Sequence, residues 1–258
     1  MKNKIWGSFD EAVADVSDGA SIMMFWWGPA GTPQNLIQAI RNKGVQNLTI
    51  ITHNFVPGWV GSHVCTEDEM MTPFFLIKQT KRLISAWPRP IEAASEMGGY
   101  IDEAVKKGEI ELEVTSHGTL AERIRAGGSG IGGFYTPTGI GTVLEEGKER
   151  KIIDGKEYIL EKPLRADFSF IKAYKADKRG NLVYRGSERA ANPYLAMAAD
   201  ITIAEVNEIV GVGELDPEVI VTPGIFVDRI VKIPEGALGS FKQRDELRRK
   251  YLIKGVEK

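Results

Sequence analysis

Short apolar runs alternate along this chain with segments whose apolar residues recur every three or four positions. The first apolar run, 21–27, has the length of a buried strand. Leu36, Ile37 and Ile40 follow at helical spacing, and a second apolar run occupies 47–52. This order predicts a βαβ unit, in which the two strands lie parallel.

The helix between these two strands has recognisable ends. We expect Thr32 to cap its first turn with the side-chain hydroxyl, because threonine is a favoured residue at that position. Pro33 fits the first helical position, where its missing amide hydrogen is not needed. Gly44 is expected to end the helix.

The same alternation continues along most of the chain. It predicts helices over 73–80, 90–107, 119–128 and 192–199, and strands over 82–87, 109–114, 168–177, 180–186 and 201–210, with two further short strands on either side of 222–224. We therefore expect one domain spanning 1–258, with an open, largely parallel twisted sheet and flanking helices.

Residues 143–162 have a different pattern. Polar and apolar residues alternate on both sides of Asp154 and Gly155, a pair that is typical of a tight hairpin turn. This segment predicts a β-hairpin that protrudes from the domain.

A glycine-rich stretch, 127–142, precedes the hairpin and contains seven glycines in its sixteen residues. Glycine serves where a tight turn is needed or where another group approaches the backbone closely. One interpretation is a set of turns between core strands, and the other is a loop that faces a bound ligand. The candidate pocket loop comprises Gly132, Gly133, Phe134 and Tyr135.

Composition narrows the possible functions. The chain has 258 residues, of which 43% are hydrophobic and 26% charged, which is enough to build a large core. A net charge of -2 without a basic stripe argues against a nucleic-acid surface. The single cysteine, Cys65, suits a reducing compartment. Four acidic residues before the first apolar run argue against a signal peptide, and we expect a cytoplasmic protein that spans no membrane.

The three histidines, His53, His63 and His117, have no spacing typical of a metal site. His53 and His117 each follow the carboxyl end of a predicted strand, and ligands of open α/β sheets bind outside those ends. They are therefore candidate site residues, although a surface or hydrogen-bonded histidine is an equally good interpretation. His63 is given no role.

Two other segments partly resemble known functional motifs, namely a phosphate-binding loop and a nucleophile segment. Gly28 to Gly31 follow the first strand but lack both a dinucleotide fingerprint and a phosphate-loop lysine. Ser187 and Glu188 resemble a nucleophile segment, but no neighbouring residue in the sequence would orient the carboxylate. The residue chemistry thus predicts a pocket without a nucleophile of its own, and no resident metal or cofactor.

Three long segments, 112–142, 164–210 and 213–231, together resemble the α (A) chains of family I coenzyme A transferases. The resemblance covers about residues 18–231. It implies an open α/β sheet shared with some sugar-phosphate isomerases, and a homologous β subunit with which the chain assembles. A glutamate on that β chain attacks the acyl-CoA and carries CoA as a thioester before a second carboxylic acid receives it. CoA thioester is then a substrate, and the missing nucleophile is explained.

The resemblance also implies which residues of this chain line the acyl or carboxylate pocket. His53 and Asn54 stand where the family has two asparagines, and His117 stands where it has a glutamine. The family's glycine-rich segment after the first strand matches 25–33, in which Phe25 and Trp26 replace two glycines. Its glycines at 28 and 31 are retained. The implied substrate-binding residues are Phe25, Trp26, Gly28, Gly31, His53, Asn54 and His117, and the glycine stretch would shape the wall beside the partner's glutamate.

Two alternatives remain open from the residues. Because histidine can activate water, the same fold could serve a CoA-thioester hydrolase or an enzyme that cleaves carbon–carbon bonds. A non-catalytic small-molecule binding module is the other alternative, since a fold does not determine a function.

Overall fold

The computed structural model describes residues 3–25, 30–54, 76–88 and 99–240 of the chain. Within these ranges nine strands form one sheet in the order β1-β12-β11-β9-β2-β3-β4-β5, and β10 pairs with β9 outside this path. Every pair along the path is parallel, and β10 alone among the described strands of this sheet runs antiparallel to its neighbour. The strands are β1 (Ile5–Trp6), β2 (Ser21–Met24), β3 (Leu48–Asn54), β4 (Thr80–Trp87), β5 (Glu111–Val114), β9 (Ala166–Asp177), β10 (Leu182–Val183), β11 (Ala199–Val210) and β12 (Arg229–Lys232). The predicted open, largely parallel sheet is confirmed.

Helices cover both faces of this sheet. In β2, Ile22 and Met24 pack into a core that includes residues of α1, α2 and α4, whereas Met23 between them packs with α5 and α6. A strand buried on both faces reads as a continuous apolar run, which is why 21–24 carries no polar alternation. The α-helices are α1 (Phe9–Ala12), α2 (Gln34–Lys43), α4 (Gly99–Lys106), α5 (His117–Gly128) and α6 (Asn192–Leu195), and the 3-10 helices are η2 (Val143–Glu145), η3 (Gly186–Arg189), η4 (Pro217–Val219) and η5 (Gly224–Phe226).

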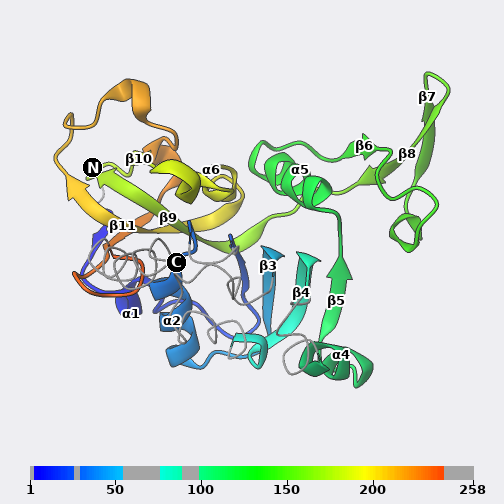
Figure 1. Ribbon diagram of the computed structural model, residues 1–258, viewed down its shortest axis with the longest axis horizontal. Helices are drawn as coiled ribbons and strands as arrows, with labels where there is room; N and C mark the ends of the chain where they lie inside the picture. The colour runs from blue at the N-terminus through cyan, green and yellow to red at the C-terminus, as the bar shows by residue number, and fades with distance from the viewer. Residues whose placement is uncertain (1–2, 26–29, 55–75, 89–98, 241–258) are drawn as a thin grey trace, which may run out of the picture.

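The carboxyl ends of β3, β4 and β5 lie along one edge of the sheet and point toward α5 (Figure 1). Helix α5 begins at this edge because Ser116 caps it: the Ser116 side chain accepts a hydrogen bond from the backbone N–H of Thr119. Leu120 and Ile124 are fully buried, which fixes the face that α5 turns toward the sheet. The first residue of α5 is therefore held at the carboxyl edge.

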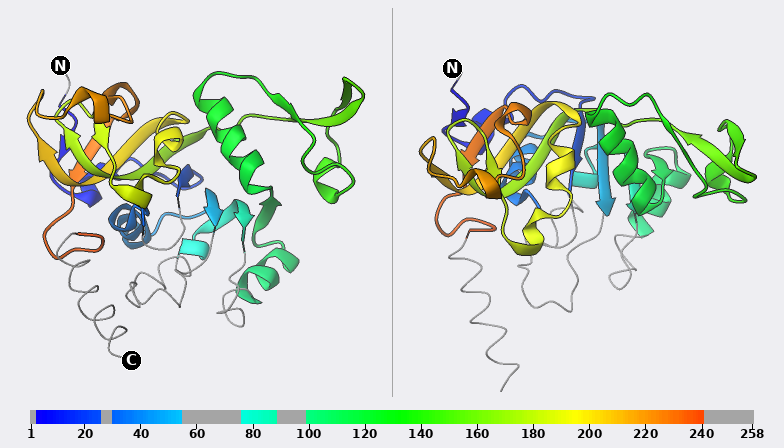
Figure 2. Two further views of the ribbon diagram at one scale, coloured as in Figure 1. Left: turned by 45° about the horizontal axis from the view of Figure 1, so that its top comes forward. Right: turned by 90° about the horizontal axis from the view of Figure 1, so that it is seen from above.

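A three-stranded antiparallel ribbon projects from the body of the molecule (Figures 1 and 2). It consists of β6 (Phe134–Thr136), β8 (Lys156–Glu161) and β7 (Arg150–Ile153). Asp154 and Gly155 form its turn with positive φ angles of 50° and 75°, as the Asp-Gly signal requires. The protruding hairpin is confirmed, and β6, which pairs with β8, was not predicted.

Several predicted boundaries are wrong. The helix expected over 192–199 ends at Leu195, because residues from Ala199 onward pair with β9. Of the two strands expected around 222–224, the second forms as β12, whereas the first is reduced to an isolated bridge between Thr222 and Leu182. Pro217 and Pro223, which lack the amide hydrogens of a ladder, begin or cap 3-10 helices there. Thr32 does not cap α2; Pro33 occupies that position and makes no side-chain cap.

Other predictions lie partly outside the described residues. The helices expected over 73–80 and 90–107 are described only from residues 76 and 99 onward, and α4 occupies the second. Gly44 ends α2 in the left-handed conformation, as expected. In the described part of the chain, no helix has both the length and the apolar character that crossing a membrane requires.

The first glycines of the glycine-rich stretch lie in the last turn of α5. A Cβ atom on Gly127 would stand 1.9 Å from the backbone oxygen of Leu164, and one on Gly128 would stand 2.7 Å from Cβ of Met197. These two glycines therefore allow the chain's own segments to pack directly against α5. By contrast, a Cβ on Gly132 would meet nothing within 4 Å.

Gly127→Ala is expected to destabilise the fold by about 2 kcal/mol or more, because backbone atoms would have to move to admit the methyl group. The measurement is thermal unfolding of the purified protein. The matched control is Gly132→Ala, which should stay within about 0.5 kcal/mol of the wild type. Equal stability of the two variants would show that α5 does not pack as described.

Candidate active site

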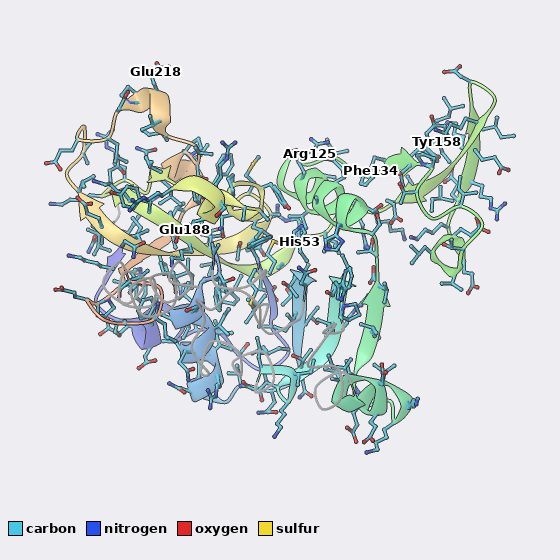
Figure 3. The ribbon with its side chains drawn as sticks, viewed as in Figure 1. His53, Arg125, Phe134, Tyr158, Glu188 and Glu218 are labelled. Atoms are coloured by element: carbon cyan, nitrogen blue, oxygen red, sulfur yellow. The ribbon has the colours of Figure 1, made fainter. Side chains whose placement is uncertain are left out.

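Four side chains from three elements meet at the carboxyl edge of the sheet. His53 and Asn54 are the last two residues of β3, His117 is the first residue of α5, and Tyr194 belongs to α6. We call these four residues the carboxyl-edge cluster. Figure 3 places His53 beneath α5, at the end of β3.

The end of β3 is held in place by neighbouring hydroxyl groups. The Ser85 hydroxyl donates to the backbone oxygen of His53 (3.3 Å), and the Thr52 hydroxyl donates to the backbone oxygen of Asn54 (3.0 Å). His53 is 6% exposed and Asn54 2% exposed. Both polar side chains are thus presented from a rigid, buried strand end, which favours a defined geometry.

His117 and Asn54 are directly hydrogen-bonded. Nε2 of His117 lies 2.9 Å from Oδ1 of Asn54. Because an amide oxygen only accepts, Nε2 of His117 carries the proton in this orientation. Nδ1 of His117 is then the nitrogen left to face a ligand: it accepts a hydrogen bond in the neutral ring and donates one only in the imidazolium form.

His53 is kept neutral. Burial, followed by the charge of nearby His117, lowers the pKa of His53 to about 4. Its Nε2 lies 2.8 Å from the hydroxyl of Tyr194. The two imidazole rings lie close together, with centroids 6.4 Å apart. Two adjacent histidines therefore do not both carry charge at neutral pH.

Aromatic rings surround the two histidines. Phe25, which follows β2, has its ring centroid 5.7 Å from that of His53, and Trp87, at the end of β4, lies 6.4 Å from His117. Phe25 is half-buried, and Trp87 is 41% exposed. An apolar surround of this kind lowers the local dielectric, which strengthens hydrogen bonds to a developing charge.

The structure brings together most of the described residues that the sequence singled out. His53, Asn54, His117 and Phe25 are neighbours, although His53 and Asn54 end β3 rather than follow it. Gly31 has φ of 74°, and a Cβ there would stand 2.5 Å from the backbone oxygen of Glu188, so this glycine lets the loop before α2 pack against η3. Trp26 and Gly28 lie outside the described residues.

The candidate pocket loop lies elsewhere in this chain. Phe134 stands at the base of the ribbon, apart from His53 (Figure 3). A Cβ on Gly133 would stand 3.0 Å from the backbone oxygen of Glu161, so this glycine packs against β8. A role of 132–135 in a pocket shared with a partner stays a prediction.

Sequence reasoning missed Tyr194 and Trp87. Trp87 ends a strand that was predicted, and the carboxyl-edge rule that selected His53 applies to it equally. Tyr194 carried no such signal, because it lies in the middle of a predicted helix. Its contact with His53 joins residues 141 positions apart.

The acidic residue at the end of β9 has a structural role. Asp177 accepts hydrogen bonds from the backbone N–H groups of Arg179 and Asn181, which closes the turn after β9. Among the described residues, no group of three or more His, Cys, Asp or Glu side chains could hold a metal ion.

The sequence profile of the family described as Coenzyme A transferase matches residues 7–233. The chain belongs to the coenzyme A transferase family. It is 44% identical to the A subunit of the 3-oxoadipate CoA-transferase of Pseudomonas putida, over 93% of this chain and 98% of that relative. It is 40% identical to the alpha subunit of the acetate CoA-transferase of Escherichia coli K12, over 90% and 97% of the two chains.

Two solved structures share the fold of this chain. An acyl-CoA transferase of Escherichia coli O157:H7, in a thioester complex with CoA, superimposes with a TM-score of 0.73 at 21% identity. The superposition covers 92% of the present chain and 48% of the longer Escherichia coli chain. The decarboxylase AibA/AibB superimposes with a TM-score of 0.71 at 24% identity, over 99% and 95% of the two chains. At these identities the superpositions establish the fold alone.

Proposed function

We propose that this chain is the α subunit of a heteromeric CoA-transferase, which moves CoA from an acyl-CoA to a carboxylic acid when a partner subunit is bound. The observation that carries the proposal is the 44% identity to a relative named as the A subunit of such an enzyme, across 98% of that relative. A second relative at 40% identity is also named as a single subunit. CoA thioester is a substrate of the reaction, not a resident cofactor.

The partner supplies the nucleophile in this proposal. A glutamate carboxylate on the partner attacks the acyl carbonyl and expels CoA thiolate. The thiolate then attacks the glutamyl carbonyl, which releases the first acid and leaves a glutamyl-CoA thioester. A second carboxylate reverses both steps and receives CoA. Splitting the transfer through covalent intermediates lowers each barrier, because a carboxylate is a weak nucleophile.

This chain shapes the acyl or carboxylate pocket. Each attack produces a tetrahedral oxyanion, and preorganised hydrogen-bond donors stabilise that charge. Asn54 accepts from Nε2 of His117 and so holds the ring, and Nδ1 of the protonated ring donates to a substrate oxygen. The surrounding rings of Phe25 and Trp87 keep this region apolar. The glycine-rich loop at 132–135 forms the wall beside the partner, and the enzyme is cytoplasmic.

Reconstitution tests the proposal. The chain alone, the partner alone and their complex are each incubated with an acyl-CoA and a second carboxylic acid, and CoA exchange is followed by mass spectrometry. We expect exchange by the complex only, with a CoA-sized adduct on the partner when the acceptor acid is left out. Exchange by the isolated chain would overturn the division of labour.

The same assay separates the alternatives. Release of free CoA without any acceptor acid would favour a hydrolase, whereas strict dependence on a carboxylate excludes it. Binding of phosphosugars without any CoA exchange would favour a binding module.

A further inference from the structure

We propose that Tyr194 is a positioning residue: its hydroxyl donates a hydrogen bond to Nε2 of His53 and holds this ring as the tautomer with its proton on Nδ1. His53 then presents an N–H group to an oxygen atom of the acyl group or the acceptor acid. This inference rests on the proposed function, in which His53 lines the pocket.

The contact between the two side chains is well defined. The hydroxyl oxygen of Tyr194 lies 2.8 Å from Nε2 of His53, and the two ring centroids lie 5.9 Å apart. Tyr194 reaches this position from α6, which packs against α5 and the sheet next to β2. Helix α6 is itself anchored by Asn192, whose side-chain amide donates to the backbone oxygen of Gly31 (3.0 Å).

Both partners keep the protonation state that the bond needs. Burial raises the pKa of Tyr194 to about 12, with a further rise from the charge of Glu122, so its hydroxyl retains the proton. The pKa of His53 is about 4, so its ring is neutral and has one donor and one acceptor nitrogen. A single proton therefore lies between the hydroxyl oxygen of Tyr194 and Nε2 of His53.

The direction of the bond follows from the partners present. If Nε2 of His53 donated, the tyrosine hydroxyl proton would need another acceptor, and among the described residues Tyr194 has no second hydrogen bond. A phenol is also the better donor and an imidazole nitrogen the better acceptor of the two. Tyr194 thus donates, Nε2 accepts, and Nδ1 of His53 carries the proton, since the hydrogen bond at one nitrogen sets the state of the other.

Nδ1 of His53 is the group that this arrangement leaves unsatisfied. It is buried and has no hydrogen-bond partner among the described residues. A buried donor without an acceptor costs free energy, and such groups in native structures often mark functional sites. Because His53 is only 6% exposed, a substrate oxygen reaches Nδ1 only when neighbouring side chains move aside.

Tyr194→Phe removes the hydroxyl and keeps the ring, so it tests the hydrogen bond alone. In the assembled complex we expect kcat/KM for the carboxylic acid to fall about tenfold, as for other groups that hold a histidine in one tautomer. The matched control is Tyr184→Phe. Tyr184 is likewise half-buried and hydrogen-bonded through its hydroxyl to that of Thr222 (2.8 Å), and among the described residues no hydrogen bond or ring contact joins it to the carboxyl-edge cluster. Its loss should leave kcat/KM unchanged.

The tautomer itself is measured by ¹⁵N NMR of the imidazole rings, with only this subunit labelled. The chain has three histidines, so the signals are assigned by substituting His63 and His117 in turn. We expect the proton of His53 on Nδ1 in the wild type and in Tyr184→Phe, and mainly on Nε2 in Tyr194→Phe. A structural role for Tyr194 would not move the proton between nitrogens.

The outcomes are distinguishable. A wild-type His53 with its proton on Nε2 overturns the inference without any variant. A Tyr194→Phe complex with wild-type kcat/KM also overturns it, whatever its tautomer. If the wild-type complex fails to exchange CoA, the proposed function fails instead, and the tautomer measurement still decides the direction of the Tyr194–His53 bond.

Discussion

His117→Ala is expected to lower the turnover of the assembled CoA-transferase by about tenfold or more, because a preorganised donor beside the reacting carbonyl is lost. The substitution removes the ring that Asn54 holds at 2.9 Å. Assembly should remain intact, since His117 is only half-buried and the cap of α5 is provided by Ser116. Turnover and KM are measured by CoA exchange, and assembly by size-exclusion chromatography.

His117→Gln is the matched control for this prediction. A glutamine amide can still donate a hydrogen bond to a substrate oxygen, and the family resemblance implies a glutamine at this position. We expect His117→Gln to keep most of the wild-type turnover. If His117→Ala is as fast as the wild type, His117 does not belong to the pocket. If both variants are equally slow, the histidine acts as an acid or base rather than as a donor.

Periodicity was sufficient to predict the sheet and its neighbouring helices. The order of strand, helix and strand over 21–52 dictates a parallel pair, and the Asp154–Gly155 turn dictates the ribbon. The errors lie where tertiary pairing overrides local pattern. Residues 196–199 have helical spacing, yet β11 begins at Ala199 because its backbone pairs with β9.

The sequence predicted only those site residues that lie at the carboxyl ends of predicted strands, where ligands of open α/β sheets bind. His53 lies at the carboxyl end of β3, and His117 follows the carboxyl end of β5 on the same edge of the sheet. Their proximity therefore follows from the sheet topology. Tyr194 belongs to a helix placed by the connection between β9 and β11, and no local pattern reports that placement. The buried position of Glu205 was not predicted for the same reason, because in the sequence Glu205 is a single polar residue within a predicted strand.

Glu205 and Lys172 form a buried pair at the centre of the sheet. They are direct neighbours in the β11–β9 register, and both are completely buried. The Glu205 carboxylate accepts from the backbone N–H groups of Asn35 (2.9 Å) and Leu36 (3.1 Å), which supplies the cap that Thr32 does not give α2. The Lys172 ammonium donates to the backbone oxygen of Gly239 (3.0 Å).

Glu205→Ala is expected to destabilise the protein by about 3–5 kcal/mol, because it leaves a buried lysine without its counter-charge. The cap of α2 is lost as well, which adds about 1 kcal/mol. The measurement is thermal or urea-induced unfolding of the assembled complex. The matched control is Glu208→Ala, since Glu208 pairs with Lys175 (2.8 Å) on the same two strands but at the surface. Its loss should cost about 1 kcal/mol or less.

A double variant shows whether the cost comes from the unpaired charge. Glu205→Gln keeps an acceptor for the α2 amides, and Lys172→Met removes the ammonium while keeping the length of the side chain. Burial is the largest influence on Glu205 and raises its pKa to about 7, although the charge of Lys172 and the N–H donors of Asn35 and Leu36 lower it. Desolvation of the carboxylate therefore outweighs these favourable contacts. We therefore expect the double variant to be more stable than either Lys172→Met or Glu205→Gln alone, with a coupling of about 2 kcal/mol. Additive losses would mean that Glu205 stabilises the fold through its contacts with α2 and not through Lys172.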